Sequence, residues 1–463
     1  MSPADLSIPE AGQQFRAGQL TSLELTQSCL DRISCRDVTY HAFVATDVEG
    51  ALEAAETADR ERLEGQDKGL LHGIPIAIKD LIDTAGMRTS YGSRIFGDHL
   101  PGADADVVRR LKAAGAILIG KLNTYEFGMV GPSFDLPFPP AANPWRSSHF
   151  TGGSSSGSAA AVAGGLVRTT VGSDTGGSIR SPASYCGVVG LKPTYGAIAK
   201  GGAYSLAPSL DHLGPISATV AEAALTLDVI CQSSETPRVA GSASAKLGQP
   251  LDGLRIGYAR DWFAADPELQ PGILPALDDA ASKLSILGAR IEEVMLPDAK
   301  VFEACGGVIV HAESFALHRS QLAAKGDLYS ENVFPYFMAG IALDESDLAL
   351  AQRAALLLRA EIDAGVFAHC DALLTATTCT TALPFSEFRG AAARWTPMRT
   401  MAFNVTGHPA ISVPCGFVDG LPVGMQIVGK HSDEATVCQI GHAFEQSTDF
   451  GAIRPPWPDF PPY

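Results

Sequence analysis

Basic residues are scarce in this chain of 463 residues. It contains 34 lysines and arginines against 51 aspartates and glutamates, which gives a net charge of −17 at pH 7. An acidic protein is repelled by the phosphates of nucleic acids and of anionic lipids. No local run of lysine and arginine reverses this balance. The composition therefore predicts a protein that binds neither nucleic acid nor a membrane.

Paired cysteines and long apolar segments are missing as well. The nine cysteines include no C-x-x-C pair, and most of them lie in apolar stretches. This pattern predicts free, buried thiols in a reducing compartment, and neither a disulfide framework nor a metal site. Residues 1–20 lack the basic and apolar regions of a signal peptide, and no apolar run reaches the roughly 20 residues of a membrane span. We therefore expect a cytoplasmic protein without a bound metal.

Apolar residues make up 46% of the chain, enough for a large core. Residues 8–65 are rich in helix-forming residues and carry an apolar stripe with a spacing of four, which predicts helices. Residues 74–80 and 116–121 are short apolar runs that predict strands, and 106–114 between them predicts a helix. This order predicts a parallel strand pair with a right-handed crossover. Continuous apolar strands predict a sheet covered on both faces.

The rest of the chain continues this mixture of helices and strands. Residues 131–153, dense in proline and aromatic residues, predict a loop, and the Ser/Ala/Gly-rich segment 234–249 predicts a linker. Further helices are expected at 158–166, 218–231, 269–287 and 345–369, and further strands at 167–171, 409–414 and 424–429. Because apolar strands precede and follow the linker, we expect one sheet in a single large α/β domain.

Lys79 ends the first predicted strand. Side chains alternate along a strand, so Lys79 shares its face with the small residues Pro75 and Ala77. A lysine surrounded by apolar residues loses solvation of its charge, and its pKa falls. Lowering the pKa from about 10.4 to about 7–8 takes about 3–5 kcal/mol. Lys79 is thus either a base that works near neutral pH or an ordinary lysine that reaches solvent or pairs with Asp80.

Residues 151–158 form a glycine- and serine-rich turn that opens an alanine-rich helix. Backbone N–H groups of such a turn point in one direction. The turn also contains G-x-S-x-G, the nucleophile elbow of α/β-hydrolases, with Ser155 as the nucleophile. That alternative needs a strand directly before the turn and a late histidine, for which the candidates are His408, His431 and His442.

A second turn, residues 174–183, places two glycines directly before Ser178. Consecutive glycines expose backbone N–H groups beside the serine hydroxyl. An oxyanion hole requires this arrangement, and each of its donors contributes on the order of 10²–10³ in rate. Since structural turns also contain Gly-Gly-Ser, this segment alone is a weak indicator.

Taken together, the three motifs resemble the amidase signature family. The family pattern has three parts: a lysine that ends an apolar strand, a Gly-Gly-Ser-Ser turn, and an Asp-x-Gly-Gly-Ser turn whose serine follows the first serine of the earlier turn by 24 residues. In this chain the three parts supply Lys79, Ser154 and Ser178, respectively. The resemblance covers nearly the whole chain and is weakest at 235–370. It continues through residues 190–196, 209–215, 403–410 and 420–426.

The resemblance implies a role for each of these residues. Ser178 attacks the carbonyl carbon, Ser154 on a cis peptide bond to Gly153 relays the proton, and Lys79 is the base. The backbone amides of the second turn form the oxyanion hole. Its implied members are Thr175, Gly176, Gly177 and Ser178. Supporting roles fall to Ser155, Gly153, Asp174 and Arg180. No cofactor and no metal are implied.

The fold implied by the resemblance is one α/β/α domain with a central mixed, twisted sheet covered by helices on both faces. Residues 1–463 would form this single domain, with 1–65 as an N-terminal helical segment that packs on it. Residues 235–400 would form a variable region on the substrate side. Candidate pocket residues are Tyr125, Met129 and Phe134.

The leading hypothesis is an amidase that cleaves the carbon–nitrogen bond of a small amide, such as an aryl amide or a carbamate (urethane), through an acyl-enzyme on Ser178. The expected partner is this small molecule, and the resemblance also allows a homodimer. One alternative is the amidase subunit of a tRNA-dependent amidotransferase, a glutaminase. Ser156 counts against that alternative, because that protein usually has glycine there. The other alternative is the esterase with Ser155 as its nucleophile.

Overall fold

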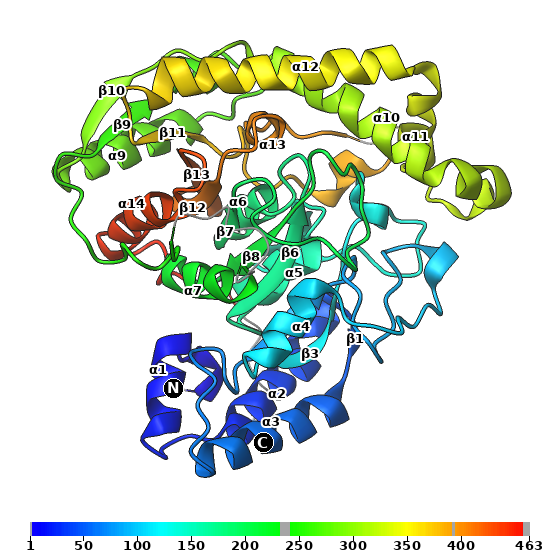
Figure 1. Ribbon diagram of the computed structural model, residues 1–463, viewed down its shortest axis with the longest axis vertical. Helices are drawn as coiled ribbons and strands as arrows, with labels where there is room; N and C mark the ends of the chain where they lie inside the picture. Colours follow the sequence, from blue (N-terminus) through cyan, green and yellow to red (C-terminus); the bar gives the residue numbers. More distant parts are fainter. Residues whose placement is uncertain (1, 232–240, 391–393, 457–463) are drawn as a thin grey trace.

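Eleven strands form one continuous mixed sheet through the centre of the molecule, and helices flank it on both faces (Figure 1). The computed structural model describes residues 2–231, 241–390 and 394–456. A separate pair, β4 and β5, lies outside the sheet. In chain order the strands are β1 (Phe43–Thr46), β2 (Pro75–Lys79), β3 (Ile117–Leu122), β4 (Ala142–Asn143), β5 (Arg146–Phe150), β6 (Thr169–Asp174), β7 (Val189–Lys192), β8 (His212–Ser217), β9 (Arg255–Tyr258), β10 (Arg290–Glu293), β11 (Ala372–Ala376), β12 (Ala410–Val418) and β13 (Leu421–Gly429).

Several helices begin where the sequence supplies a capping box. In α1, α2 and α12, the residue before the helix accepts a backbone N–H bond, and an acidic residue three positions later bonds back to it. In chain order the α-helices are α1 (Ile8–Arg16), α2 (Ser22–Tyr40), α3 (Val48–Leu63), α4 (Asp106–Ala113), α5 (Ser156–Ala163), α6 (Arg180–Cys186), α7 (Val220–Ile230), α8 (Arg260–Ala264), α9 (Ile273–Ile286), α10 (Ala299–Lys325), α11 (Phe334–Ala339), α12 (Glu345–Ile362), α13 (Met401–Val405) and α14 (Glu434–Gln446).

The order of strands across the sheet joins the two halves of the chain. It runs β1-β3-β2-β6-β8-β7-β12-β13-β11-β9-β10. The strands before residue 232 meet those after residue 240 where β7 pairs antiparallel with β12. The prediction of one shared sheet in a single α/β domain is therefore confirmed. Residues 234–240 of the predicted linker lie outside the described residues.

The predicted parallel pair is also present and sets the position of the site. β2 and β3 pair in parallel, with α4 between them in sequence. β2 pairs in parallel with β6 on its other side. Parallel neighbours end at the same edge of a sheet, so the last residues of β2 and β6 lie next to each other. All five residues of β2 are buried, as the continuous apolar run predicted.

Some short strands escaped the sequence-based prediction. The segment 8–65, predicted to be helical, contains β1, which pairs antiparallel with β3 at the edge of the sheet. The loop predicted at 131–153 contains the β4–β5 pair. These strands have two to five residues, too few for an apolar period to emerge, and their partners in pairing decide their conformation.

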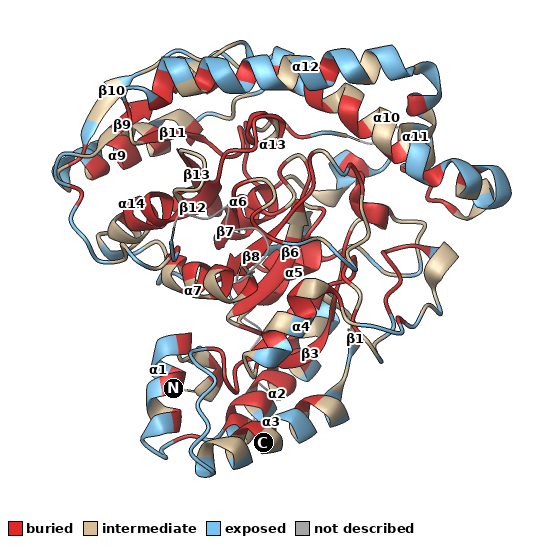
Figure 2. Cartoon of the chain, viewed as in Figure 1, coloured by how far each residue is buried: buried red, intermediate tan, exposed pale blue. Residues whose placement is uncertain are grey.

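Burial follows the layers of the fold. The central strands are buried, whereas α12 at the top of the view turns an exposed outer face to solvent (Figure 2). No helix among the described residues combines the length and the apolar character that crossing a bilayer requires. The cytoplasmic location stays a prediction.

Replacing Leu373 with alanine should lower the free energy of unfolding by about 2–5 kcal/mol, because the side chain is fully buried on β11 and its loss leaves a cavity. Leu357→Ala on α12 is the matched control, since that side chain is 71% exposed. Urea denaturation followed by circular dichroism measures both variants. Equal destabilisation by the two substitutions would contradict the placement of β11 inside the sheet.

Candidate active site

The buried amine of Lys79 lies at the edge where β2 and β6 end. Its Nζ is 2.8 Å from Ser154 Oγ, 2.9 Å from Ser155 Oγ and 2.9 Å from Ser173 Oγ. The side chain has no exposed surface. The turn before α5, with two serines, and strand β6, with one, thus bring their hydroxyl groups to one amine.

This environment changes the acidity of Lys79. Burial lowers the pKa of its ammonium group to about 7, although the nearby charges of Asp174 and Asp211 raise it in part. Of the two readings of Lys79 from the sequence, this burial favours the base over a lysine that reaches solvent. At neutral pH a large fraction of Lys79 is therefore an uncharged amine that can accept a proton.

Ser154 and Ser155 lie in the turn before α5. The Gly153–Ser154 peptide bond is cis, as the family resemblance implied. A side chain at Gly153 would meet the ring of Tyr125 at 2.3 Å, so only glycine fits there. Ser154 is 2% exposed and Ser155 is fully buried.

Ser155 cannot act as the nucleophile of an elbow. Its hydroxyl donates to the carbonyl of Ser173 at 3.1 Å and accepts from Lys79, and it does not line the active-site cavity. The strand that precedes the turn, β5, belongs to the separate β4–β5 pair and not to the central sheet, from which the elbow of an α/β-hydrolase rises. His408, a histidine that this alternative would use, contacts Asp363 and Thr406. The α/β-hydrolase alternative is therefore wrong.

Ser178 lies in the turn between β6 and α6 and lines a small cavity of about 60 Å³. Its hydroxyl makes no hydrogen bond to any residue that the structure describes, so it is available to a bound molecule. Its carbonyl accepts a bond from the backbone N–H of Ser155 at 3.2 Å, which joins the two turns.

The four backbone amides predicted to form the oxyanion hole differ in whether their N–H groups are already hydrogen-bonded. Gly177 N–H donates to the carboxylate of Asp174 at 2.8 Å, so this amide is already engaged. The prediction for Gly177 is corrected on this ground. The N–H groups of Thr175, Gly176 and Ser178 have no partner among residues 2–231, 241–390 and 394–456. Gly177 has a φ of +135°, and a Cβ there would meet Thr400 Oγ1 at 2.1 Å.

A buried ion pair holds this turn in place. Asp174 and Arg180 have no exposed surface, and Arg180 Nη2 is 2.8 Å from Asp174 Oδ1. Burial alone would raise the pKa of the Asp174 carboxyl, but the charge and hydrogen bonds of Arg180 hold it well below its usual range. Arg180 also donates to the carbonyl of Thr400 and to the side chains of Gln426 and Asn404.

Four residues that contact the site were not singled out from the sequence. Ser173 contacts Lys79, and Asp211 accepts from Thr175 Oγ1 at 2.6 Å. Thr400 donates to the carbonyl of Gly176, and Asn404 donates to Asp174. Asp211 and Asn404 fall within segments that carry the family resemblance, which was the available signal.

The lining of the cavity is mostly apolar and aromatic. Tyr125 and Met129 belong to it, together with Phe150, Tyr185 and Met398. The described lining contains no histidine, cysteine, aspartate or glutamate that could hold a metal. Its single charged side chain is Arg394.

Phe134 does not line this cavity. Its ring packs edge-on against Phe385, with the centroids 5.8 Å apart, and the guanidinium carbon of Arg389 lies 4.4 Å from the ring centroid. The prediction that Phe134 is a pocket residue is therefore wrong, because the loop residues pack against each other.

A larger cavity of about 470 Å³ adjoins the first. Its rim carries charges of both signs, including Glu268, Lys300 and Glu303. The two cavities share six lining residues: Gly176, Val310, Trp395, Thr396, Met398 and Met401. A molecule whose reacting carbonyl lies at Ser178 would thus extend towards a charged rim.

Comparison with known proteins extends this picture. The family model described as Amidase matches residues 24–438. A curated relative from Chloroflexus aggregans, named as one of the subunits of glutamyl-tRNA(Gln) amidotransferase, is 39% identical over 482 residues. The match covers 97% of this chain and 98% of that protein.

Two solved structures are similar over nearly their whole length. Native peptide amidase from Stenotrophomonas maltophilia has a TM-score of 0.85 and 32% identity, with 98% of each chain covered. A chain of a vestigial protein complex, described as revealing the evolutionary origins of an s-triazine catabolic enzyme, has a TM-score of 0.88 and 32% identity. The match covers 96% of this chain and 98% of that one.

These findings correct the prediction on partners. The curated relatives are named as subunits of glutamyl-tRNA(Gln) amidotransferase, which contradicts the prediction that the partners of this chain include no nucleic acid. The net charge is a property of this chain alone, so it does not indicate whether a chain acts on nucleic acid as part of a larger complex. The family itself is established by the match over residues 24–438. The chain therefore belongs to the amidase signature family, whose members are hydrolases of carbon–nitrogen bonds.

Proposed function

We propose that this chain is a serine amidase that cleaves a carboxamide through an acyl-enzyme on Ser178, with Ser154 as the proton relay and Lys79 as the base. The observation that carries the proposal is the buried Lys79 amine in contact with Ser154, next to the turn that presents Ser178 to the cavity.

The hydrogen bonds around Lys79 support a direction of proton transfer. Ser155 uses its hydroxyl proton on the carbonyl of Ser173, so it accepts a hydrogen bond from Lys79. A neutral amine has two N–H bonds and one lone pair. If Lys79 donates to Ser155 and Ser173, its lone pair faces Ser154, whose hydroxyl can donate to it. Ser154 would then accept the proton of Ser178.

The reaction proceeds in two halves. Ser178 Oγ bonds to the carbonyl carbon while its proton moves to Ser154 and the proton of Ser154 moves to Lys79. The backbone N–H groups of Thr175 and Gly176 are placed to stabilise the oxyanion. The tetrahedral intermediate then breaks its C–N bond, and the leaving amine takes the proton back through Ser154. Water cleaves the acyl-enzyme by the same proton route.

Removing the proposed nucleophile should abolish the activity. We expect Ser178→Ala and Ser154→Ala to lower kcat by at least about 10³-fold. Ser155→Ala removes only a supporting hydrogen bond, so we expect a loss of about 10–10²-fold. Amine release measures the rates, and intact-protein mass spectrometry of a quenched reaction locates the acyl group. Full activity of Ser178→Ala, or an acyl group on another residue, would refute the assignment.

The proposed base should give the activity a defined pH dependence. Lys79 accepts a proton only as a neutral amine, and burial lowers its pKa to about 7. We therefore expect kcat/KM to fall about tenfold per pH unit below pH 7 and to level off above it. Lys79→Ala should remove this fall of kcat/KM below pH 7 together with most of the activity. Lys112→Ala, an exposed control, should keep the same fall of kcat/KM. A profile that is flat between pH 5.5 and 8 would contradict the role of Lys79.

The curated relatives favour glutamine as the substrate, with this chain as the amidase subunit of a tRNA-dependent amidotransferase. They are named as subunits of glutamyl-tRNA(Gln) amidotransferase, and the sequences match over nearly the full length of both proteins. The cavities are compatible with glutamine. A side-chain carboxamide at Ser178 would direct the ammonium and carboxylate groups towards Arg394 and the charged rim. Cleavage would release ammonia and leave a γ-glutamyl group on Ser178.

Hydrolysis of a small amide or urethane with an apolar acyl group is the second candidate. The specific observation in its favour is the lining of the cavity next to Ser178, where Tyr125, Met129, Phe150 and Met398 surround the space for the acyl group. A structural neighbour with peptide amidase activity in its name has the same fold.

A substitution at Arg394 separates the two candidates. For glutamine, Arg394→Met should raise KM by at least about tenfold, because a charge-assisted contact to the carboxylate is lost. For an apolar carboxamide or a urethane it should leave KM nearly unchanged. Arg389→Met is the matched control, since Arg389 lies over Phe134 outside the cavity lining. Ammonia release is measured for the purified chain and for the chain isolated from its own cells with any bound subunits or RNA.

Each outcome of that experiment favours one substrate class. Glutamine hydrolysis that depends on Arg394, together with co-purifying subunits, supports the amidotransferase. Apolar amide or urethane hydrolysis without glutaminase activity, in both preparations, would overturn it in favour of the second candidate.

The division of the chain into regions is part of the proposal. Residues 235–400 would form the substrate side of the domain, and the cavity residues Val310 and Trp395 support this. Residues 1–65 would form a segment that braces the domain from outside the site. α2 packs on α5 and α3 packs on β3, which is consistent with that role.

A further inference from the structure

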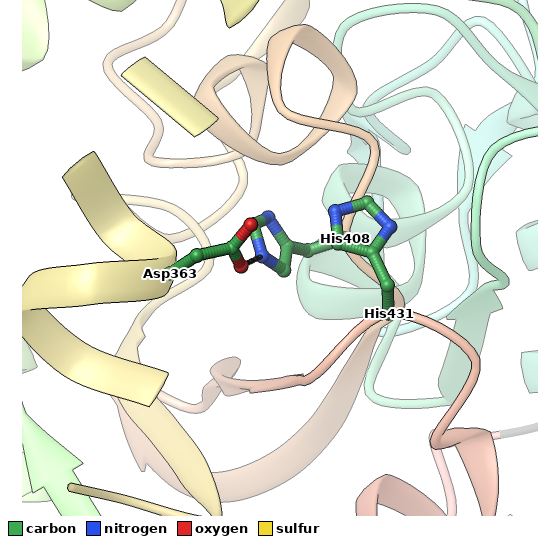
Figure 3. A group of neighbouring side chains, drawn as sticks. All are labelled: Asp363, His408 and His431. Atoms are coloured by element: carbon green, nitrogen blue, oxygen red, sulfur yellow. Dashed lines mark hydrogen bonds and ion pairs between the residues drawn. The ribbon is translucent and has the colours of Figure 1, made fainter. Parts of the chain in front are cut away.

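Three side chains outside the active site meet at one point. Asp363 begins a single π-helical turn (Asp363–Phe367) at the end of α12, His408 precedes β12, and His431 follows β13. One potential ligand atom from each lies within 4.8 Å of the other two. Figure 3 shows the carboxylate of Asp363 facing the ring of His408, with His431 beside that ring. None of the three residues lines the cavity of Ser178.

The hydrogen bonds of His408 fix which of its nitrogens carries a proton. The Thr406 hydroxyl donates its one hydrogen to the carbonyl of Ala402 at 2.9 Å. Thr406 Oγ1 must therefore accept the bond of 2.8 Å from His408 Nδ1, which makes Nδ1 the protonated nitrogen. In the neutral ring, Nε2 then carries a lone pair.

That lone pair faces another acceptor. His408 Nε2 is 2.9 Å from Asp363 Oδ1. Two acceptors at this distance repel each other unless a positive charge lies between them or a second proton enters the ring. The His408 side chain has no exposed surface, and removing an imidazolium from water is costly.

His431 adds a third potential ligand. Its ring centroid lies 4.1 Å from that of His408. Its Nε2 is buried and has no hydrogen-bond partner among the described residues. A buried nitrogen without a partner destabilises a folded protein, so its presence here calls for a ligand or a water molecule.

We propose that Asp363, His408 and His431 bind a divalent transition-metal ion of the Zn²⁺ type. Two neutral imidazoles and one carboxylate suit this class of ion. A cation at their meeting point satisfies the lone pair of His408 and removes its repulsion with Asp363. The three ligands leave a fourth position for water, which can enter because the Asp363 side chain is 43% exposed.

The second shell and the distances suit such an ion. A metal-bound histidine usually donates its other ring N–H to a neighbouring acceptor, and His408 does so to Thr406. In a tetrahedral site with bonds of about 2.0–2.2 Å, the donor atoms lie about 3.3–3.6 Å apart. The largest separations, up to 4.8 Å, therefore need a contraction of about an ångström, whereas His408 Nε2 and Asp363 Oδ1, now 2.9 Å apart, must move apart slightly. Arg359, whose Nε is 3.6 Å from Asp363 Oδ2, would share that carboxylate with the ion.

The role of the ion would be structural. It would connect the end of α12 with the two central strands β12 and β13. The segment between α13 and β12, which contains His408, follows Met401, a residue of the Ser178 cavity. Binding should therefore stabilise the folded chain while leaving the chemistry to Ser178, Ser154 and Lys79. This site was not expected from the sequence, because its ligands are 45 and 23 residues apart and form no known spacing pattern.

Zn²⁺ binding to the full-length, tag-free chain tests the proposal. After dialysis against a chelator, calorimetric titration with Zn²⁺ should give one site, and Zn²⁺ should raise Tm. Asp363→Asn keeps the shape of the side chain and His431→Gln keeps a polar side chain, and each should weaken binding at least about tenfold. Glu361→Gln, an exposed acidic residue on the same helix, is the matched control and should bind as the unmodified chain does.

Circular dichroism of each variant checks that it folds. Binding of Co²⁺ in place of Zn²⁺ gives an absorption spectrum that distinguishes nitrogen and oxygen ligands from thiolates. No Zn²⁺ binding at millimolar concentration would overturn the proposal. Unchanged affinity in Asp363→Asn and His431→Gln would also overturn it, as would a thiolate-to-cobalt charge-transfer band, which would indicate binding at cysteines.

Discussion

The buried ion pair of Asp174 and Arg180 is the interaction on which the active site depends. Both side chains are removed from solvent, and losing one partner of such a pair typically costs about 3–5 kcal/mol. The pair holds the turn of Ser178 through the N–H of Gly177 and reaches Asn404 and Gln426 in the other half of the chain. The geometry of the nucleophile is therefore tied to the closure of the sheet between β7 and β12.

A second constraint acts on Lys79. Its amine loses water on folding and gains only hydroxyl groups, so the uncharged form is stabilised relative to the ammonium. In the proposed relay a lysine takes the part that histidine has in other serine hydrolases, and its burial among hydroxyl groups explains how it can do so. The proposed relay acts on the amide bond itself, while the lining of the two cavities would contact the groups on either side of it.

Much of the fold could be predicted from the sequence, because a long run of regularly spaced apolar residues indicates a helix or strand largely independently of its surroundings. The β2–α4–β3 unit and the late strands β12 and β13 were found in this way. The short strands β1, β4 and β5 were missed because their partners determine them, and the strands β7–β11 and the long helix α10 were not predicted either. Phe134 was misassigned because an aromatic residue in a loop packs equally well against a neighbouring loop as against a ligand.

The sequence by itself determined the family and the parallel pair of strands, and it singled out the three side chains to which we assign the reaction, because these depend on local composition and on the spacing of motifs. Only the tertiary structure decided that Ser173 and Asp211 join the site, that the N–H of Gly177 is engaged by Asp174, and that Asp363, His408 and His431 meet. Such contacts join positions far apart in the chain. Their geometry is set by strand pairing and by the burial of polar groups, neither of which leaves a local pattern in the sequence.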